Sequence, residues 1–239
     1  MLKYQKIALE IEKYITVHSL KQGDKIPVIE TLISQYKVSK STIIKALNLL
    51  EAKGIVFMVR GSGTFVRGQI RKGYNNLLLT QDCREDDSKN PPFLRKIIGM
   101  EIVRAIPDVA SALGVEEDSK VYSVRYVHYI EKQVLCMEQV FYNKNIISYL
   151  DKEIASESIF NYLKNILGLK IGFPDIYINL DKLNSEEASI FGLNIGDPML
   201  CKEIIYHLAS GQPFCYSRAV FNYKQAKFFI KGNRLNSYI

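Results

Sequence analysis

The stretch between residues 39 and 66 constrains the fold of this chain most strongly. Ser39 is a good N-cap residue, and it precedes a predicted helix that runs to about Lys53. Within that helix the apolar residues follow the spacing of one buried stripe, at Ile43, Ala46, Leu47 and Leu50. Two apolar strands around a glycine-containing turn then predict a β-hairpin, with its parts at 55–59, 60–63 and 64–66.

The residues before Ser39 predict two further helices. Residues 2–18 place apolar side chains near helical spacing among Lys and Glu. A turn follows at 21–25, and Pro27 is tolerated at the start of a short helix over about 29–36. The order of helix, short helix, capped helix and hairpin is that of a winged helix-turn-helix.

The excess positive charge is confined to the first third of the 239 residues. Residues 1–75 contain 13 Lys and Arg against 5 Asp and Glu, whereas residues 76–239 contain 19 against 20. A basic module joined to a near-neutral one predicts a polyanionic partner for the N-terminal part only. The length suits two domains. We predict a DNA-binding domain at 1–67, a linker at 68–76 and a second domain at 77–239.

The predicted recognition surface has the chemistry that DNA binding requires. A helix that begins Ser39-Lys40-Ser41-Thr42 presents hydroxyls, a cation and its positive end to phosphates and base edges. A wing tip at Arg60-Gly61 places an arginine beside the minor groove, where the backbone must approach closely.

Four motifs, in this order, resemble the GntR family of bacterial transcription regulators over about residues 3–66. They are Gly23-Asp24-Lys25-Ile26-Pro27, Val38-Ser39-Lys40-Ser41-Thr42, Ala46-Leu47-x-x-Leu50-Glu51-x-x-Gly54 and Gly61-x-Gly63-Thr64-Phe65-Val66. The resemblance implies contacts to double-stranded DNA at Ser39, Lys40, Ser41, Thr42, Arg60 and Gly61.

The chain departs from this family pattern at two positions. Arginine is usual where Glu30 and Ile44 stand. Glu30 would repel phosphate unless it is paired, and Ile44 offers only apolar contact, such as to a thymine methyl group. Lys45 is predicted to take over some phosphate contact. We therefore expect the family's docking with a different operator sequence, and we add Ile44 and Lys45 to the predicted DNA contacts.

The C-terminal part alternates predicted strands and helices. Two long hairpins are predicted, Val121–Ile130 with Val134–Tyr142 and Pro198–Leu208 with Phe214–Asn222. Strands at 97–106 and 173–180 and helices at 107–113, 145–150, 156–167 and 185–191 complete the pattern.

An internal repeat organises this part. Ala110-Ser111-x-Leu113-Gly114-Val115 and Ala188-Ser189-x-Phe191-Gly192-Leu193 each precede a polar turn and a long hairpin, and Cys136 and Cys215 take corresponding places in the two hairpins. Two helix-plus-hairpin halves that face one another in an antiparallel sheet are therefore predicted. A cleft between such halves is a natural small-molecule site, although duplication for packing alone needs no ligand.

The element order resembles the UTRA effector-binding domain of HutC-type GntR regulators over about residues 77–230. The best local pieces are Ser158-Ile159-Phe160-x-Tyr162-Leu163 and Gly211-Gln212-Pro213-x-x-Tyr216-Ser217. The resemblance implies an α+β chain whose second domain is a chorismate lyase-like antiparallel sheet with flanking helices. It also implies a small acidic effector, often a sugar phosphate, held by Thr80, Arg125, His128, Glu138 and Ser158.

Three of these residues have a structural alternative. Arg125 would grip a phosphate or carboxylate bidentately, or it would pair with Glu203, its approximate counterpart in the repeat. His128 is either a ligand contact or a packed sheet histidine. Glu138 either accepts hydrogen bonds from sugar hydroxyls or faces solvent as an ordinary strand residue.

Further signals exclude several classes of protein and site. Cys215 and Phe221 stand where the family often has a glutamate and an aromatic hydroxyl, so its usual amino-sugar phosphate does not carry over directly. Residues 1–18 mix Lys and Glu, unlike a signal peptide, and no window approaches the ~18–20 apolar residues of a membrane helix. With four widely spaced cysteines and three histidines, we expect no metal site, no cofactor and reduced thiols in the cytoplasm.

Two functions remain open from the sequence. The first is a transcription regulator, a repressor by expectation, that binds a palindromic operator as a homodimer and is controlled by its effector. The alternative is a small-acid-processing enzyme on the lyase-like fold with an attached DNA-binding module. Because no nucleophile elbow, metal cluster or glycine-rich phosphate loop is present, we expect no enzymatic activity.

Overall fold

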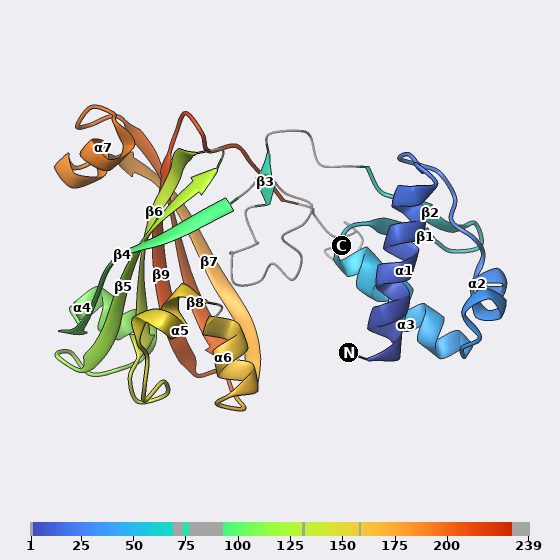
Figure 1. Cartoon of the computed structure of the whole chain (residues 1–239), viewed down its shortest axis with the longest axis horizontal. Helices are drawn as coiled ribbons and strands as arrows, with labels where there is room; N and C mark the ends of the chain where they lie inside the picture. Colours follow the sequence, from blue (N-terminus) through green and yellow to red (C-terminus); the bar gives the residue numbers. More distant parts are fainter. Residues whose placement is uncertain (1, 69–73, 77–92, 131, 158, 231–239) are drawn as a thin grey trace. The chain divides into compact units, whose positions relative to one another are not determined.

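A computed structural model describes residues 2–68, 74–76, 93–130, 132–157 and 159–230. The chain divides into two compact units, the first reaching Tyr74 and the second spanning Asn75–Phe228, and each is described by itself (Figure 1). No helix within the described ranges is long and apolar enough to cross a membrane.

The first unit is the predicted winged helix-turn-helix. Its elements in chain order are α1 (Lys3–Val17), α2 (Ile29–Tyr36), α3 (Lys40–Ala52), β1 (Val56–Val59) and β2 (Gly63–Val66). The predicted stripe of α3 is fully buried and packs with apolar residues of α1, α2 and both strands. Ser39 caps α3, and Gly54 adopts a left-handed φ of 65° just beyond its end, as expected for such a terminus.

The second unit is built on one six-stranded antiparallel sheet with the order β4-β5-β6-β9-β8-β7. Its strands are β4 (Phe93–Arg104), β5 (Lys120–Ile130), β6 (Gln133–Asn143), β7 (Ile171–Lys182), β8 (Pro198–Leu208) and β9 (Pro213–Asn222). The helices are α4 (Pro107–Leu113), α5 (Lys152–Ser156), α6 (Ile159–Asn165) and α7 (Ser185–Phe191). The short strands β3 (Asn75–Asn76) and β10 (Phe228–Phe229) pair separately. The chain is therefore α+β, as predicted.

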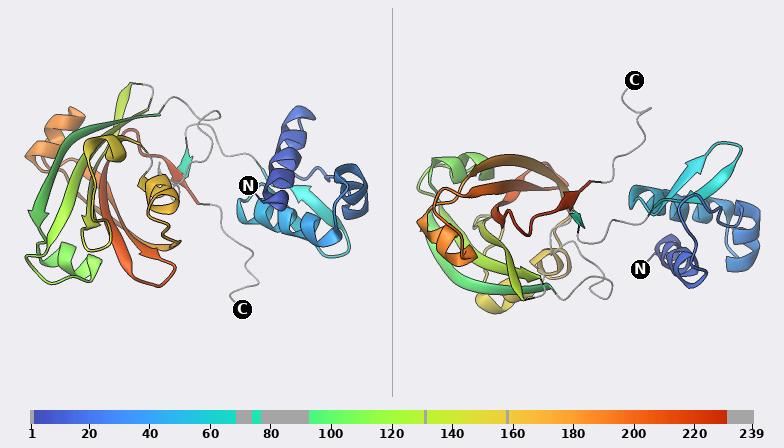
Figure 2. Two further views of the ribbon diagram at one scale, coloured as in Figure 1. Left: turned by 60° about the horizontal axis from the view of Figure 1, so that its bottom comes forward. Right: turned by 90° about the horizontal axis from the view of Figure 1, so that it is seen from above.

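Helices cover both faces of this sheet. We name as the inner face the one against which α5 and α6 pack, where Tyr126, Val140 and Ile204 enter the largest core cluster. The outer face is the one against which α4 and α7 pack, over residues such as Tyr216 and Val220. In Figure 1, α5 and α6 lie in front of the sheet, whereas α4 and α7 lie at its left side, and Figure 2 gives two further views.

The predicted repeat is visible in the strand order. Three strands of the first half, β4-β5-β6, meet three strands of the second half, β9-β8-β7, and the halves join where β6 pairs with β9. Gln139 and Arg218 are opposite each other in that pairing. When these two are aligned as equivalent positions, Cys136 matches Cys215, as the repeat predicts, and Glu138 matches Ser217. A local two-fold axis therefore passes between Gln139 and Arg218.

Two predicted helices differ from the structure. Residues 145–150 contain no helix, because the side-chain oxygen of Asn143 accepts a hydrogen bond from the N–H of Asn145 at 3.0 Å and closes a turn there. The helix predicted at 156–167 is instead α6, and α5 precedes it. The carboxylate of Asp151 accepts from the N–H of Ile154 and caps α5.

Candidate functional site

Three hydroxyls gather at the N-terminus of α3. Ser39 Oγ lies 3.0 Å from Ser41 Oγ and 2.9 Å from Thr42 Oγ1, and it accepts a hydrogen bond from the N–H of Thr42 at 3.4 Å. Ser39, Lys40 and Ser41 are exposed. The positive end of a helix and its unpaired N–H groups favour an anion at this point. This arrangement suits a phosphate of the DNA backbone.

The next turn of α3 contains Ile44, which stands where the family usually has arginine, and Lys45, which is predicted to take over some phosphate contact. Ile44 is 38% exposed, and Lys45 beside it is also exposed. Their neighbours Ile43 and Ala46 are buried in the core of the unit, so α3 offers its outward side from Lys40 to Lys45. Glu30 is exposed in the first turn of α2, where the helix dipole stabilises a carboxylate.

The tip of the β1–β2 hairpin carries the predicted wing contacts. Arg60 and Gly61 are exposed, and the N–H of Ser62 closes the turn on the carbonyl of Val59 at 3.0 Å. Gly61 has a φ of 79°, which glycine adopts without the steric penalty of a side chain. The structure thus places all eight predicted DNA contacts on two adjoining elements, α3 with its cap and the hairpin turn.

The inner face of the sheet carries a polar cluster around Glu138, which is 18% exposed. Its Oε2 lies 2.7 Å from Nε2 of His128, which is buried, and its Oε1 accepts a hydrogen bond from the hydroxyl of Ser217. Burial alone would raise the pKa of Glu138. The hydrogen bond and charge of His128, the hydrogen bond of Ser217 and the charge of Lys202 outweigh burial and lower this pKa to about 2. Glu138 is therefore a carboxylate at neutral pH.

Lys202 supplies a buried cation to the same cluster. Its side chain is in β8, is 6% exposed, and holds Nζ 5.6 Å from the ring centroid of Phe221. The ring of Phe221 thus lies beside the ammonium group of Lys202, at a position where the family often has an aromatic hydroxyl. The thiol of Cys136 lies in the same region, and burial, followed by the charge of Glu138, raises its pKa well above the ordinary value. It stays a neutral thiol.

Arg95 connects the inner face with helix α5. Its guanidinium carbon lies 4.6 Å from the ring centroid of Tyr126, and its Nη2 donates to the carbonyl oxygens of Ala155, Ser156 and Glu157 at 3.2, 3.3 and 2.5 Å. The hydroxyl of Tyr126 also donates to Ala155 at 3.1 Å. Because Arg95 is opposite His128 in the β4–β5 pairing, a second cation stands at the edge of the Glu138 cluster.

Arg125 lies on the other face of the sheet. It is opposite Gln139, whose amide donates to Ser123 at 3.1 Å on the outer face. Its Nη1 binds Oε1 of Glu186 in α7 at 3.1 Å, with both side chains partly exposed. Its ion-pair partner is Glu186, not the Glu203 that the repeat suggests.

The structure therefore brings together two of the five predicted effector contacts. His128 and Glu138 are in hydrogen-bond contact, Arg125 is not with them, and Thr80 and Ser158 lie outside the described residues. Three further members of the inner cluster were not predicted from the sequence, namely Arg95, Lys202 and Ser217. Ser217 is the last residue of the motif that begins at Gly211. In strands that are buried on both faces, however, the sequence does not show which side chains share a face. Across the described part of the chain, no group of three or more His, Cys, Asp or Glu residues is placed to hold a metal ion.

Comparison with known proteins gives two family matches. Residues 3–66 match the family "Bacterial regulatory proteins, gntR family", and residues 95–227 match "UTRA domain". The chain is 49% identical over 233 residues to the uncharacterized HTH-type transcriptional regulator YydK of Bacillus subtilis, covering 98% of each chain. It is also similar to the crystal structure of YydK, with a TM-score of 0.86 over 98% of this chain and 100% of that one.

More distant relatives are named by their regulatory roles. The chain is 28% identical to the HTH-type transcriptional regulator GmuR of Bacillus subtilis, covering 91% of this chain and 92% of the relative. It is 24% identical to the mannosyl-D-glycerate transport/metabolism system repressor MngR of Escherichia coli, covering 98% and 97%. Its relatives are transcriptional regulators and not enzymes, which removes the enzymatic alternative. The chain belongs to the GntR family of transcription regulators, in the HutC-type branch that joins an N-terminal winged helix-turn-helix to a C-terminal UTRA domain.

Proposed function

We propose that this regulator is a homodimeric repressor whose operator affinity falls when a small acidic metabolite binds the inner face of its UTRA domain. The inner-face cluster carries the proposal, because it gathers two cations, Arg95 and Lys202, around an ionised and hydrogen-bonded Glu138. Lys202 is buried, and a buried charge is costly unless it is paired. Such a cost is expected where polar recognition of a ligand is needed.

Each residue of the cluster suits one part of such a ligand. Arg95 and Lys202 would bind a phosphate or carboxylate through charge-assisted contacts. Glu138 would accept hydrogen bonds from hydroxyl groups, with His128 and Ser217 fixing its orientation. The relative MngR is named as the repressor of a mannosyl-D-glycerate system, and glycerate joins a carboxylate to hydroxyls. A hydroxylated acid is therefore the ligand class that we propose.

The palindromic operator follows from the size of the reading surface. One winged helix reads too few base pairs for a specific site, so two copies on a two-fold symmetric sequence are required. Selection from a randomised double-stranded DNA library with the full chain is expected to yield a palindrome. Lys40→Ala should weaken binding to the selected duplex by about 1–3 kcal/mol if Lys40 reads a base edge. Equal affinity for selected and scrambled duplexes at physiological salt would contradict a specific regulator.

A thermal-shift screen with sugar phosphates and small hydroxy acids tests the effector. A ligand at 100 times its Kd adds about 2.7 kcal/mol of stability, and the same compound should weaken operator binding by about 1–3 kcal/mol. Lys202→Met should abolish the shift. The exposed Lys224 provides a matched control, since Lys224→Met removes the same charge away from the cluster. A ligand that stabilises the protein without changing operator affinity would contradict the proposed control.

A further inference from the structure

The segment around Lys25 pairs with the β1–β2 hairpin of the first unit as a short third strand. The N–H of Ile26 donates to the carbonyl of Thr64 at 3.0 Å, and the N–H of Val66 donates to the carbonyl of Asp24 at 2.8 Å. Between these two bonds, Lys25 forms an antiparallel bridge with Phe65. The segment that leads into α2 is therefore fixed alongside β2, and the backbone of Lys25 has a defined position on the wing.

The side chain of Lys25 runs along the outside of this hairpin. Opposite residues of an antiparallel pair share a face, and Lys25 shares one with the stacked rings of Phe57 and Phe65, 5.5 Å apart. Gly63 follows on the same face, toward the turn. A methyl group on Gly63 would lie 2.6 Å from Cε and 3.3 Å from Nζ of Lys25. The lysine stem thus crosses Gly63, in the space that a side chain would fill.

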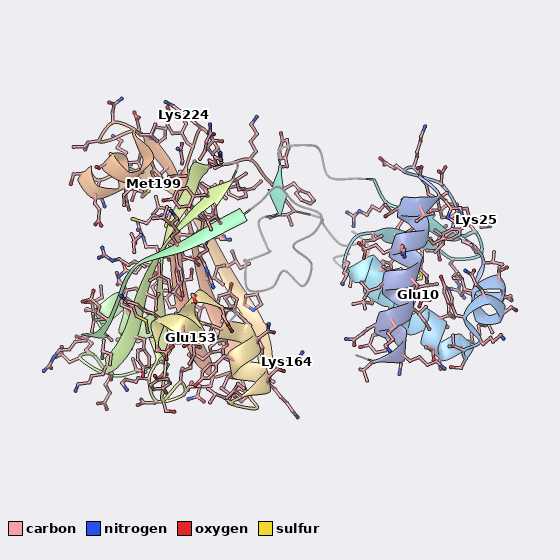
Figure 3. All side chains as sticks on the ribbon, in the orientation of Figure 1. Glu10, Lys25, Glu153, Lys164, Met199 and Lys224 are labelled. Carbon is pink, nitrogen blue, oxygen red and sulfur yellow. The ribbon has the colours of Figure 1, made fainter. Side chains whose placement is uncertain are left out.

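The ammonium group of Lys25 is available for an external anion. Lys25 is exposed, and no carboxylate of the described residues lies within ion-pair distance of it. Gly63 is opposite Val59, which directly precedes Arg60. Lys25 and Arg60 therefore place two cations on one end of the hairpin. Figure 3 shows Lys25 on the β1–β2 side of the unit.

We propose that Lys25 is a further DNA-binding residue, which contacts a backbone phosphate beside the wing while the hairpin turn enters the minor groove. The proposal rests on the DNA-binding function proposed above and adds a residue outside α3 and the turn. A cation whose stem lies on a rigid hairpin has less conformational freedom to lose on binding. It also supplies a charge to a surface on which Glu30 and Ile44 stand in place of two cations.

The salt dependence of DNA binding tests this proposal. The full chain is titrated against the duplex selected from the randomised library and against a scrambled duplex, between about 50 and 200 mM salt. Lys25→Gln should weaken binding to both duplexes alike and lower the slope of log affinity against log salt by about one per DNA-bound subunit. That change makes the salt-induced loss of affinity about threefold smaller per subunit. Lys25→Arg should keep the wild-type slope.

Two matched controls separate the contact from general effects. Lys13→Gln removes the same charge from an exposed position of α1 and should leave the slope unchanged. Gly63→Ala, at a φ of 125°, should displace the end of the lysine side chain and lower the slope toward that of Lys25→Gln. Gly23→Ala is also at a positive φ, of 89°, but nothing lies within 4 Å of the added methyl group, and it should keep the wild-type slope.

The outcomes distinguish this proposal from the proposed function. If the wild-type chain binds every duplex equally, specific regulation is wrong whatever Lys25 does. If the wild-type chain prefers the selected duplex and Lys25→Gln has the wild-type affinity and slope, the role of Lys25 is wrong and the regulator function stands.

Discussion

Two charged groups on opposite faces of the central sheet differ in their exposure to solvent. On the inner face, Glu138 is 18% exposed and shares its oxygens between His128 and Ser217 beside a buried Lys202. On the outer face, Arg125 pairs with Glu186, and their own side chains are 39% and 59% exposed. Solvent-exposed pairs contribute little to stability, whereas buried charges are costly to leave unpaired. The inner-face cluster around Glu138 is therefore expected to contribute more to stability than the exposed Arg125–Glu186 pair.

Glu138→Ala is expected to have the largest effect. It leaves Ser217 and His128 without their shared acceptor and removes the counter-charge of the buried Lys202, which should lower the free energy of unfolding by about 3–5 kcal/mol. Urea unfolding at pH 7 measures this loss. Glu186→Ala on the outer face is the control and should cost less than about 1 kcal/mol. Equal losses for both variants would remove the distinction between the faces.

Acid should destabilise the protein through the same carboxylate. The pKa of Glu138 is lowered from an ordinary value of 4.5 to about 2 in the folded chain, so its contribution is complete above pH 4.5. It is lost as the pH falls toward 2, because the unfolded state then binds a proton that the folded state does not. The share of Glu138 is about 3 kcal/mol. The free energy of unfolding should change less between these pH values for Glu138→Gln than for the wild-type chain. The same pH dependence in both proteins would contradict the role of this carboxylate.

Glu187→Ala should have an intermediate effect on the outer face. Glu187 is 2% exposed, accepts the N–H of Asn184 at 3.0 Å within the capping box of α7, and lies 3.3 Å from Arg218. Loss of a helix cap and a hydrogen bond to a half-exposed cation should cost about 2 kcal/mol. Chemical denaturation measures it. The neighbouring Glu186→Ala again serves as the control, and a cost below that control would show that α7 needs no anchor on the sheet.

Arg125→Gln should have the smallest effect. Its exposed pair with Glu186 contributes at most about 1 kcal/mol, and the thermal shift by any effector found in the screen should remain. The measurement compares the ligand-induced shift of this variant with that of Lys202→Met. If Arg125→Gln loses the shift while its own stability is unchanged, the effector binds on the outer face and the inner-face proposal is wrong.

The winged helix was predictable from the sequence almost to the residue, because its signals are local. The cap at Ser39, the stripe from Ile43 to Leu50 and the glycine turn each specify a boundary within a few residues. The short helix α5 was not predicted, because five residues are too few to show a helical spacing of apolar side chains. The cap residue Asp151 is its main sequence signal.

The proposed effector site was harder to predict, because β5 is buried on both faces. Nearly every residue from Val121 to His128 is buried, so no alternation of polar and apolar residues marks the inner face. An error of one position in such a strand exchanges the faces. Arg125 was predicted as the cation of the site, whereas its neighbour Tyr126 points to the inner face and Arg95 and Lys202 supply the cations there. Side chains from five different strands meet at this site, and the register of these strands is not a local property.

The hydrogen bond between Glu138 and Ser217 joins equivalent positions of the two halves of the sheet. A perfectly symmetric duplicate would bring two identical side chains face to face at this place. Two glutamates there would repel each other and share a proton, and two serines would leave the buried Lys202 without a carboxylate. A charged site beside the local axis therefore demands that the two halves differ there. This repeat keeps its symmetry in the order of its strands and is broken at the charged cluster beside the axis.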